Sequence, residues 1–249
     1  SIAAGEFKVL TVEFDPTRLG NFTGFVEIPM DDRTFSYFVP VFGSAEATPT
    51  AVDVYTQERN TEVDVLFVVD NSCSMGDDQQ NLANNFDSFI RQAALQQVDF
   101  QIGVTTTDVI TDPGNLVGPV LRPSTPNLEQ AFSDQVNVGV RGSGWERGLE
   151  ASSLAFTRAD QNFVNNKDLF RPGASFVVIY VSDEPDQSPL SVATYFQEMQ
   201  TRFGGDVLAA AVAGHPSCPN TAFSGRYEDI VQFTGGILEP ICSSWGQSL

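Results

Sequence analysis

Three oxygen-bearing side chains, Asp70, Ser72 and Ser74, stand two positions apart directly after a run of apolar residues. Residues two apart in an extended chain project to the same side, so a loop that leaves a strand here can direct all three toward one point. One carboxylate and two hydroxyl groups are hard oxygen donors, which suit a small divalent cation such as Mg²⁺. The sequence therefore predicts part of a metal site at the end of this apolar run.

The elements that would position such a site are strands alternating with helices. Continuous apolar runs occupy 63–69, 100–105, 175–181 and 206–213, which is typical of parallel strands buried on both faces. Between them, apolar residues recur at intervals of three and four, which is typical of helices that bury one face. These helical sets are Leu82, Phe86, Phe89, Ile90 and Ala93; Leu149, Ser153 and Phe156; Val192, Phe196, Met199 and Phe203; and Tyr227, Ile230 and Val231. The alternation predicts an α/β fold, a doubly wound, mainly parallel sheet with helices on both faces, whose ligands bind beyond the carboxyl ends of the strands.

The segment Asp70-Asn71-Ser72-Cys73-Ser74 is similar to the Asp-x-Ser-x-Ser signature of von Willebrand factor A (vWA) domains, where it belongs to a metal-ion-dependent adhesion site (MIDAS). The resemblance implies a Rossmann-like fold over 63–249 and a bound Mg²⁺, with Mn²⁺ or Ca²⁺ as alternatives. Two further loops complete the site in that family. The segment SFVVIYVSDEPD resembles the strand that delivers the family's aspartate, which implies that Asp183 is a ligand.

The second loop departs from the family pattern. The segment VNVGVRGSGWERGLEAS resembles the stretch before the family's next helix and puts Ser143 where the family has a threonine. Thr106 and Thr107, at the end of the strand over 100–105, are the alternative ligands from a second loop. The expected metal ligands are Asp70, Ser72, Ser74, Ser143 and Asp183.

Three other residues near these loops also differ from the family. Cys73 stands where many members have glycine, and we expect its soft sulfur to point away from the metal into packing. Glu184 and Asp186 replace a shorter family motif, and they are interpreted as solvated loop acids, with recruitment of a second cation as the alternative.

The first 45 residues have a different pattern. Short runs over 6–14, 22–28 and 34–42 are rich in Phe, Val, Thr and Tyr and are separated by turn residues, which predicts β-hairpins. The stretch resembles the closing half of the immunoglobulin-like repeats of abnormal-spindle, Hydin and bacterial surface-anchor proteins. Three or four strands do not close such a sandwich, so either the opening half is missing or another chain completes the sheet. The expected domains are a partial immunoglobulin-like β module over 1–46, a linker over 47–62 and a vWA domain over 63–249.

The charge and the cysteines limit the partners and the compartment. Thirteen Lys and Arg against 32 Asp and Glu give a net charge of −19, which disfavours nucleic acid and anionic membranes and favours cations or partners bridged by cations. No apolar stretch is long enough to span a bilayer. Cys218 and Cys242 flank the last helical set and are predicted to form a disulfide, with three reduced thiols as the alternative. A disulfide implies an extracytoplasmic setting, either secreted, at the cell surface or at a virion surface.

The resemblance implies an adhesion or interaction module that binds an acidic residue of a partner protein through the cation. The alternative is a structural component of a surface or virion assembly, in which the metal site is vestigial and the β module docks by strand addition. We expect no enzymatic activity, because His215 is the only histidine, no Gly-x-Ser-x-Gly motif exists and no general base is apparent beside the metal site. In either case we expect the chain to belong to a larger multidomain protein or assembly.

Overall fold

The structure is a computed structural model that describes residues 9, 11–29, 36–45, 62–95, 98–204, 207–219 and 221–243. The chain divides into two compact units, Ser1–Glu58 and Arg59–Leu249. In the part of the chain that is described, no helix is both long and apolar enough to cross a bilayer.

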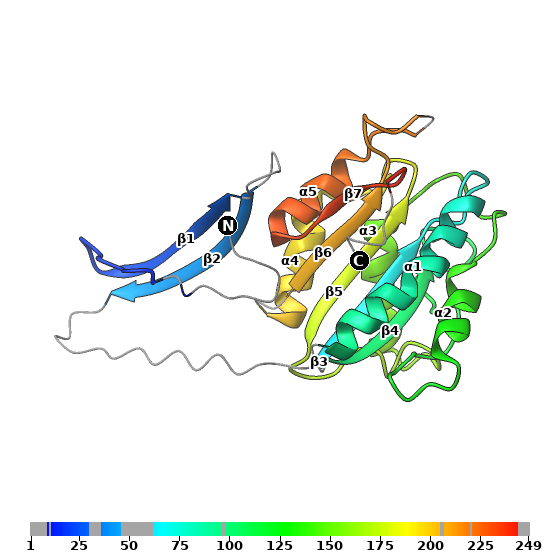
Figure 1. Ribbon diagram of the computed structural model, residues 1–249, viewed down its shortest axis with the longest axis horizontal. Coiled ribbons are helices and arrows are strands. Elements are labelled where there is room, and N and C mark those ends of the chain that lie inside the picture. Colours follow the sequence, from blue (N-terminus) through cyan, green and yellow to red (C-terminus); the bar gives the residue numbers. More distant parts are fainter. Residues whose placement is uncertain are drawn as a thin grey trace. The chain divides into compact units, whose positions relative to one another are not determined.

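The second unit contains a five-stranded sheet in which every strand pair is parallel (Figure 1). Its spatial order is β4-β3-β5-β6-β7. The strands are β3 (Glu62–Val69), β4 (Asp99–Thr106), β5 (Ser175–Ser182), β6 (Val207–Ala213) and β7 (Leu238–Pro240). The helices are α1 (Gly76–Leu95), α2 (Leu128–Val136), α3 (Gly148–Asp160), α4 (Val192–Phe203) and α5 (Gly225–Thr234).

Both faces of this sheet are covered, as the continuous apolar runs predict. Val65, Phe67 and Val69 of β3 pack in a cluster with apolar residues of α1 and α2. The alternate residues Leu66 and Val68 pack in a second cluster with residues of α3, α4 and α5. Successive side chains of a strand point to opposite faces, so a strand buried on both sides needs apolar residues at every position. The predicted doubly wound α/β fold is confirmed.

The topology creates one point where the winding reverses. The chain leaves β3 through α1 to reach β4 on one side, whereas β5 and β6 lie on the other side of β3. Loops diverge from the carboxyl ends of β3 and β5, which is where sheets of this kind bind ligands. Val69 of β3 pairs with Val181 of β5, and the Asp70 amide donates to the Val181 carbonyl at 2.9 Å. The sheet itself therefore places Asp70 next to the loop that carries Asp183.

Two elements of this unit were not predicted. Helix α2 follows Asn127, which has a left-handed conformation and makes no side-chain hydrogen bond to the helix end, so the usual start signal is missing. Strand β7 has three residues, too few for a periodic pattern.

The predicted disulfide is confirmed. Cys218 and Cys242 are joined across a Cα–Cα distance of 5.5 Å and tie the loop after β6 to the segment after β7. Cys73 is free and exposed, so the expectation that it packs inward is wrong. Its neighbour Ser72 takes the buried side of the loop instead.

The first unit contains the antiparallel hairpin β1 (Gly20–Pro29) and β2 (Ser36–Ala45), which confirms the strands predicted over 22–28 and 34–42 in their described parts. The strand predicted over 6–14 is wrong for 11–14, which form none; the ring of Phe14 packs against Phe22 and lies close over Gly43. The remainder of that strand, except residue 9, and the predicted linker, except Glu62, lie outside the described residues. The immunoglobulin-like resemblance stays a prediction.

Candidate metal centre

Four of the five predicted ligands come together at the carboxyl ends of β3 and β5. The hydroxyl oxygens of Ser72 and Ser74 are 3.3 Å apart. The Ser74 hydroxyl donates to Asp183 Oδ1 at 3.1 Å, across 109 positions of sequence. The Ser72 amide donates to Asp70 Oδ1 at 2.7 Å. Oxygens from two distant loops are therefore gathered at the edge predicted for the site.

Asp70 is the most firmly held member of this group. Its side chain is buried, with 0% of its surface exposed, and Oδ2 accepts a hydrogen bond from the Ser182 hydroxyl at 2.6 Å. The amide of the buried Gln79 side chain donates to the Asp70 carbonyl at 2.8 Å and to the Gly139 carbonyl at 2.9 Å. The loop after β3 is thus fixed to its own helix and to the second loop, so the carboxylate keeps one orientation.

Further carboxyl groups concentrate negative charge around Asp70. Burial raises the pKa of Asp70 itself. Burial and the neighbouring charges of Asp183, Asp77 and Asp70 raise the pKa of Asp78 to about 6. Burial and the charges of Asp183 and Asp70 also raise the pKa of Glu184. None of the ion pairs found among the described residues involves these groups. A bound cation would relieve this repulsion.

The second loop contributes Glu146, a residue that the sequence analysis did not single out. Glu146 is fully buried; one carboxyl oxygen accepts a hydrogen bond from the Thr107 hydroxyl, and the carboxyl group also lies within hydrogen-bond reach of the Asp70 side chain. Burial and the adjacent Asp70 carboxylate raise the pKa of Glu146 to about 8. The sequence signal that could have identified Glu146 is its place as an acidic residue in a glycine-rich loop just before a helix.

Ser143, the predicted ligand from this loop, makes contacts of another kind. Its amide donates to Asp108 Oδ2 at 3.2 Å, and its hydroxyl accepts from the Trp145 amide at 3.0 Å. The alternative residue Thr107 is held at the end of β3, since its amide donates to the Val69 carbonyl at 3.2 Å. Thr107 thus contacts Glu146, which lies beside Asp70, and both Ser143 and Thr107 stay predictions as ligands from the second loop.

Asp186, interpreted from sequence as a solvated acid or part of a second cation site, is neither. It is buried, and its carboxylate accepts from the Leu149 amide, the Ser188 hydroxyl and Arg226 Nε, the last at 2.8 Å. These contacts anchor the start of α3 and use the oxygens that a cation would need.

The donor set fits a hard divalent cation. Among the described residues no three His, Cys, Asp or Glu side chains form a metal-binding group by themselves, so hydroxyl groups have to supply part of the coordination. Ser72, Ser74, Asp70 and Asp183 offer two hydroxyls and two carboxylates, and Glu146 adds a buried carboxyl group beside Asp70. Oxygen donors of this type suit Mg²⁺, Mn²⁺ or Ca²⁺.

The two threonines that follow one another at the end of β4 give a matched test of the local hydrogen bonding. The Thr106 side chain is only 6% exposed and its hydroxyl has no hydrogen-bond partner, whereas Thr107 donates to Glu146. An unpartnered buried hydroxyl destabilises the fold, so Thr106→Val should raise the free energy of unfolding by about 1 kcal/mol. Thr107→Val should lower it by about as much. Urea denaturation of both variants checks this, and a loss of stability in Thr106→Val would contradict it.

Comparisons with known proteins find structures that share the fold of this chain. A scan against models of protein families finds no match, and neither does a search of curated proteins. Among solved structures, proximal thread matrix protein 1 from the mussel byssus matches 76% of this chain and 46% of its own, with 13% identity and a TM-score of 0.51. A structure of the same protein with a zinc-occupied MIDAS motif matches 75% of this chain and 46% of its own chain, with 12% identity and a TM-score of 0.50. This chain therefore shares its α/β fold with the mussel protein.

A von Willebrand factor type A protein from Catenulispora acidiphila also matches, over 93% of this chain and 48% of its own, with 14% identity and a TM-score of 0.46. The chain spans less than half the length of each of these structures. At such identities the likeness concerns the fold alone.

Proposed function

We propose that this chain is a metal-dependent interaction module. Asp70, Ser72, Ser74 and Asp183 would hold a divalent cation, directly or through water, and an acidic residue of a partner protein would take a remaining coordination position. The observation that carries the proposal is the row of oxygens from two loops, each within 3.3 Å of the next, at the point where the sheet winding reverses. A zinc-occupied MIDAS motif in a protein of the same fold supports it.

The burial of these residues indicates which side of the site faces a partner. Asp70 and Ser72 are buried, Asp183 is 7% exposed and Ser74 is exposed. The bound cation would supply a position for an acidic oxygen of the partner. The chain's own residues would orient the site, because the Ser182 hydroxyl and the Ser72 amide fix the buried Asp70 carboxylate.

The net charge of −19 makes the cation necessary for such a contact. An acidic partner residue is repelled by this surface and by the carboxylates around Asp70, and only a local positive charge reverses that repulsion. Binding should therefore be lost on chelation while the fold is kept.

The disulfide supports placement in an extracytoplasmic compartment. We propose binding and not catalysis, since the only histidine, His215, pairs with the Ser217 hydroxyl at 2.8 Å in the loop after β6.

Bound Mn²⁺ tests the proposal directly. Titration of the chain with Mn²⁺ should show one saturable site by electron paramagnetic resonance, and the bound ion should enhance the relaxation of water protons. Acetyl-aspartate amide should then reduce this enhancement, because its carboxylate displaces a metal-bound water. Failure to take up millimolar Mn²⁺ or Mg²⁺ would contradict the proposal and favour the structural alternative with a vestigial site. Uptake of Mn²⁺ without any effect of the aspartate probe would contradict partner binding through the metal.

A further inference from the structure

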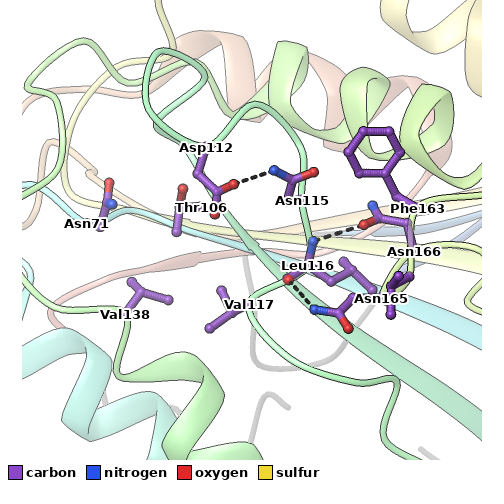
Figure 2. Close-up of a pocket in the computed structure, with 11 residues that line it drawn as sticks. Asn71, Thr106, Asp112, Asn115, Leu116, Val117, Val138, Phe163, Asn165 and Asn166 are labelled. Carbon is purple, nitrogen blue, oxygen red and sulfur yellow. Dashed lines mark hydrogen bonds between the residues drawn. The ribbon is translucent and has the colours of Figure 1, made fainter. Parts of the chain in front are cut away.

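A cavity of about 530 Å³ lies directly beside the metal loop (Figure 2). Asn71, which stands between Asp70 and Ser72 in sequence, forms one of its walls. The other walls come from Thr106 at the end of β4, from the segment 112–117, from Val138 and from the segment 163–166. The cavity and the candidate metal centre thus share a loop but use different side chains.

The hydrogen bonds around this cavity leave several buried side-chain oxygens without a partner. The side-chain nitrogens of three asparagines donate within the protein: Asn115 to Asp112 at 2.5 Å, Asn165 to the Leu116 carbonyl at 3.2 Å, and Asn166 to the Gly114 carbonyl at 2.8 Å. The side-chain oxygens of Asn71 and Asn115 are buried without a partner, as is the Thr106 hydroxyl. The half-buried Asp112 adds a negative charge. An occupant that brings hydrogen-bond donors would satisfy these oxygens.

We propose that this cavity binds a basic side chain, Lys or Arg, of the partner protein. Such a side chain supplies several donors and a positive charge to Asp112 and to the unpartnered oxygens. Its methylene groups would pack on Val117, Val138 and Phe163, which give the cavity its apolar walls. A net charge of −19 attracts basic segments, whereas an acidic occupant would leave the acceptors unpaired.

Asn71 connects this cavity to the metal centre. Its carbonyl accepts a hydrogen bond from the Gly142 amide at 2.8 Å, and a Cβ atom at Gly142 would lie 2.0 Å from Asn71 Oδ1. The absence of a side chain at Gly142 is therefore what allows the Asn71 amide to occupy its place. A partner segment with a basic and an acidic residue a few positions apart could fill the cavity and reach the metal together. This link rests on the proposed function, whereas binding of the basic side chain alone does not.

The cavity can be tested without the metal. The ¹⁵N-labelled chain is titrated in EDTA with acetyl-arginine amide and with its neutral analogue acetyl-citrulline amide, and amide shifts are followed by NMR. The arginine probe should shift Asn71, Thr106 and Asn115 saturably, with at least about tenfold higher affinity than the citrulline probe. Asp112→Asn and Thr106→Val should each weaken it by about fivefold or more. Asp229→Asn, the same charge change on the exposed surface of α5, should leave it unchanged.

Three results would overturn the proposal: no saturable shifts, equal affinity for the two probes, or equal affinity in Asp112→Asn and the unmodified chain. Thermal unfolding of each variant in the same buffer separates loss of binding from loss of fold.

The link to the metal needs a second probe set. Peptides in which an arginine and an aspartate are separated by zero to four glycines are titrated in Mg²⁺ and in EDTA. At one spacing the affinity should exceed that of acetyl-arginine amide by about tenfold or more, in Mg²⁺ only. If the arginine probe binds but no peptide shows this gain, the link to the metal is refuted and the cavity proposal stands. If the chain binds the arginine probe but takes up no Mn²⁺, the proposed function is refuted and the cavity proposal stands.

Discussion

Asp70→Asn should abolish most of the metal affinity while leaving the metal-free chain as stable as before or more stable. The carboxylate is buried and its pKa is raised by burial, so its charge destabilises the fold when no cation is present. An asparagine can keep both contacts: its oxygen accepts from the Ser72 amide, and its nitrogen can donate to the Ser182 hydroxyl, which turns its own proton to the Glu184 carbonyl 3.0 Å away. We expect Mn²⁺ affinity to fall by about 10- to 100-fold.

Thermal unfolding with and without metal separates the two effects. At a Mg²⁺ concentration of about 100 times Kd, the free energy of unfolding of the unmodified chain should rise by about 2.7 kcal/mol. This gain raises Tm by about 5–10 °C. Asp70→Asn should lose this gain, and its Tm in EDTA should equal or exceed that of the unmodified chain. A lower Tm in EDTA together with a retained Mg²⁺ gain would contradict the role assigned to Asp70.

Asp108 provides the matched control, because it is a buried carboxylate close beyond the end of the neighbouring strand β4. Burial opposes its ionisation, but hydrogen bonds from Thr111, Ile110 and Ser143 outweigh this and lower its pKa. Asp108→Asn should therefore lower Tm in EDTA and keep the gain from Mg²⁺. The two substitutions make the same chemical change and should have opposite effects.

The part of the site that follows from strand order could be predicted from the sequence. The continuous apolar runs identify β3 and β5 as strands and put Asp70 at the end of one of them, whereas the resemblance to vWA domains implies Asp183. The structure pairs the two strands as parallel neighbours, which brings both residues to one edge. Ser72 and Ser74 follow from the two-residue spacing.

The remainder depends on which atoms the loops bring together. The distance from Leu149 along the chain, read through the resemblance, predicts Ser143, but it does not show that this loop also turns the Ser143 amide to Asp108 and buries Glu146 beside Asp70. A buried carboxyl group is not visible as such in sequence, because charged residues before a helix are usually solvated or interact with the helix dipole. Asn71 was known only as the variable residue of the motif, and its unpartnered oxygen appears only once Gly142 is packed against it.

The metal-free chain should lose stability as the pH rises from about 6 to 8.5, and Glu146 should be the main cause. The pKa of Glu146 is raised from 4.5 to about 8 by burial and by Asp70. Between these values the folded state keeps a proton that the unfolded state has lost, so the free energy of unfolding falls with rising pH until the folded pKa is passed. Over two pH units within this range the free energy of unfolding should fall by about 2–3 kcal/mol, which lowers Tm by about 5–10 °C. Asp78 acts in the same direction, mainly below its pKa of about 6.

Two variants isolate Glu146 in thermal unfolding experiments in EDTA. Glu146→Gln should remove more than half of the fall in Tm between pH 6 and 8.5, because the side chain no longer ionises. Thr107→Val should move the fall to higher pH, since the Thr107 hydroxyl stabilises the ionised carboxylate and holds the pKa down. An unchanged pH profile in Glu146→Gln would assign the dependence to another group. Saturating Mg²⁺ should flatten the profile of the unmodified chain, because a cation beside Asp70 favours the ionised carboxyl groups and their protons are released on binding.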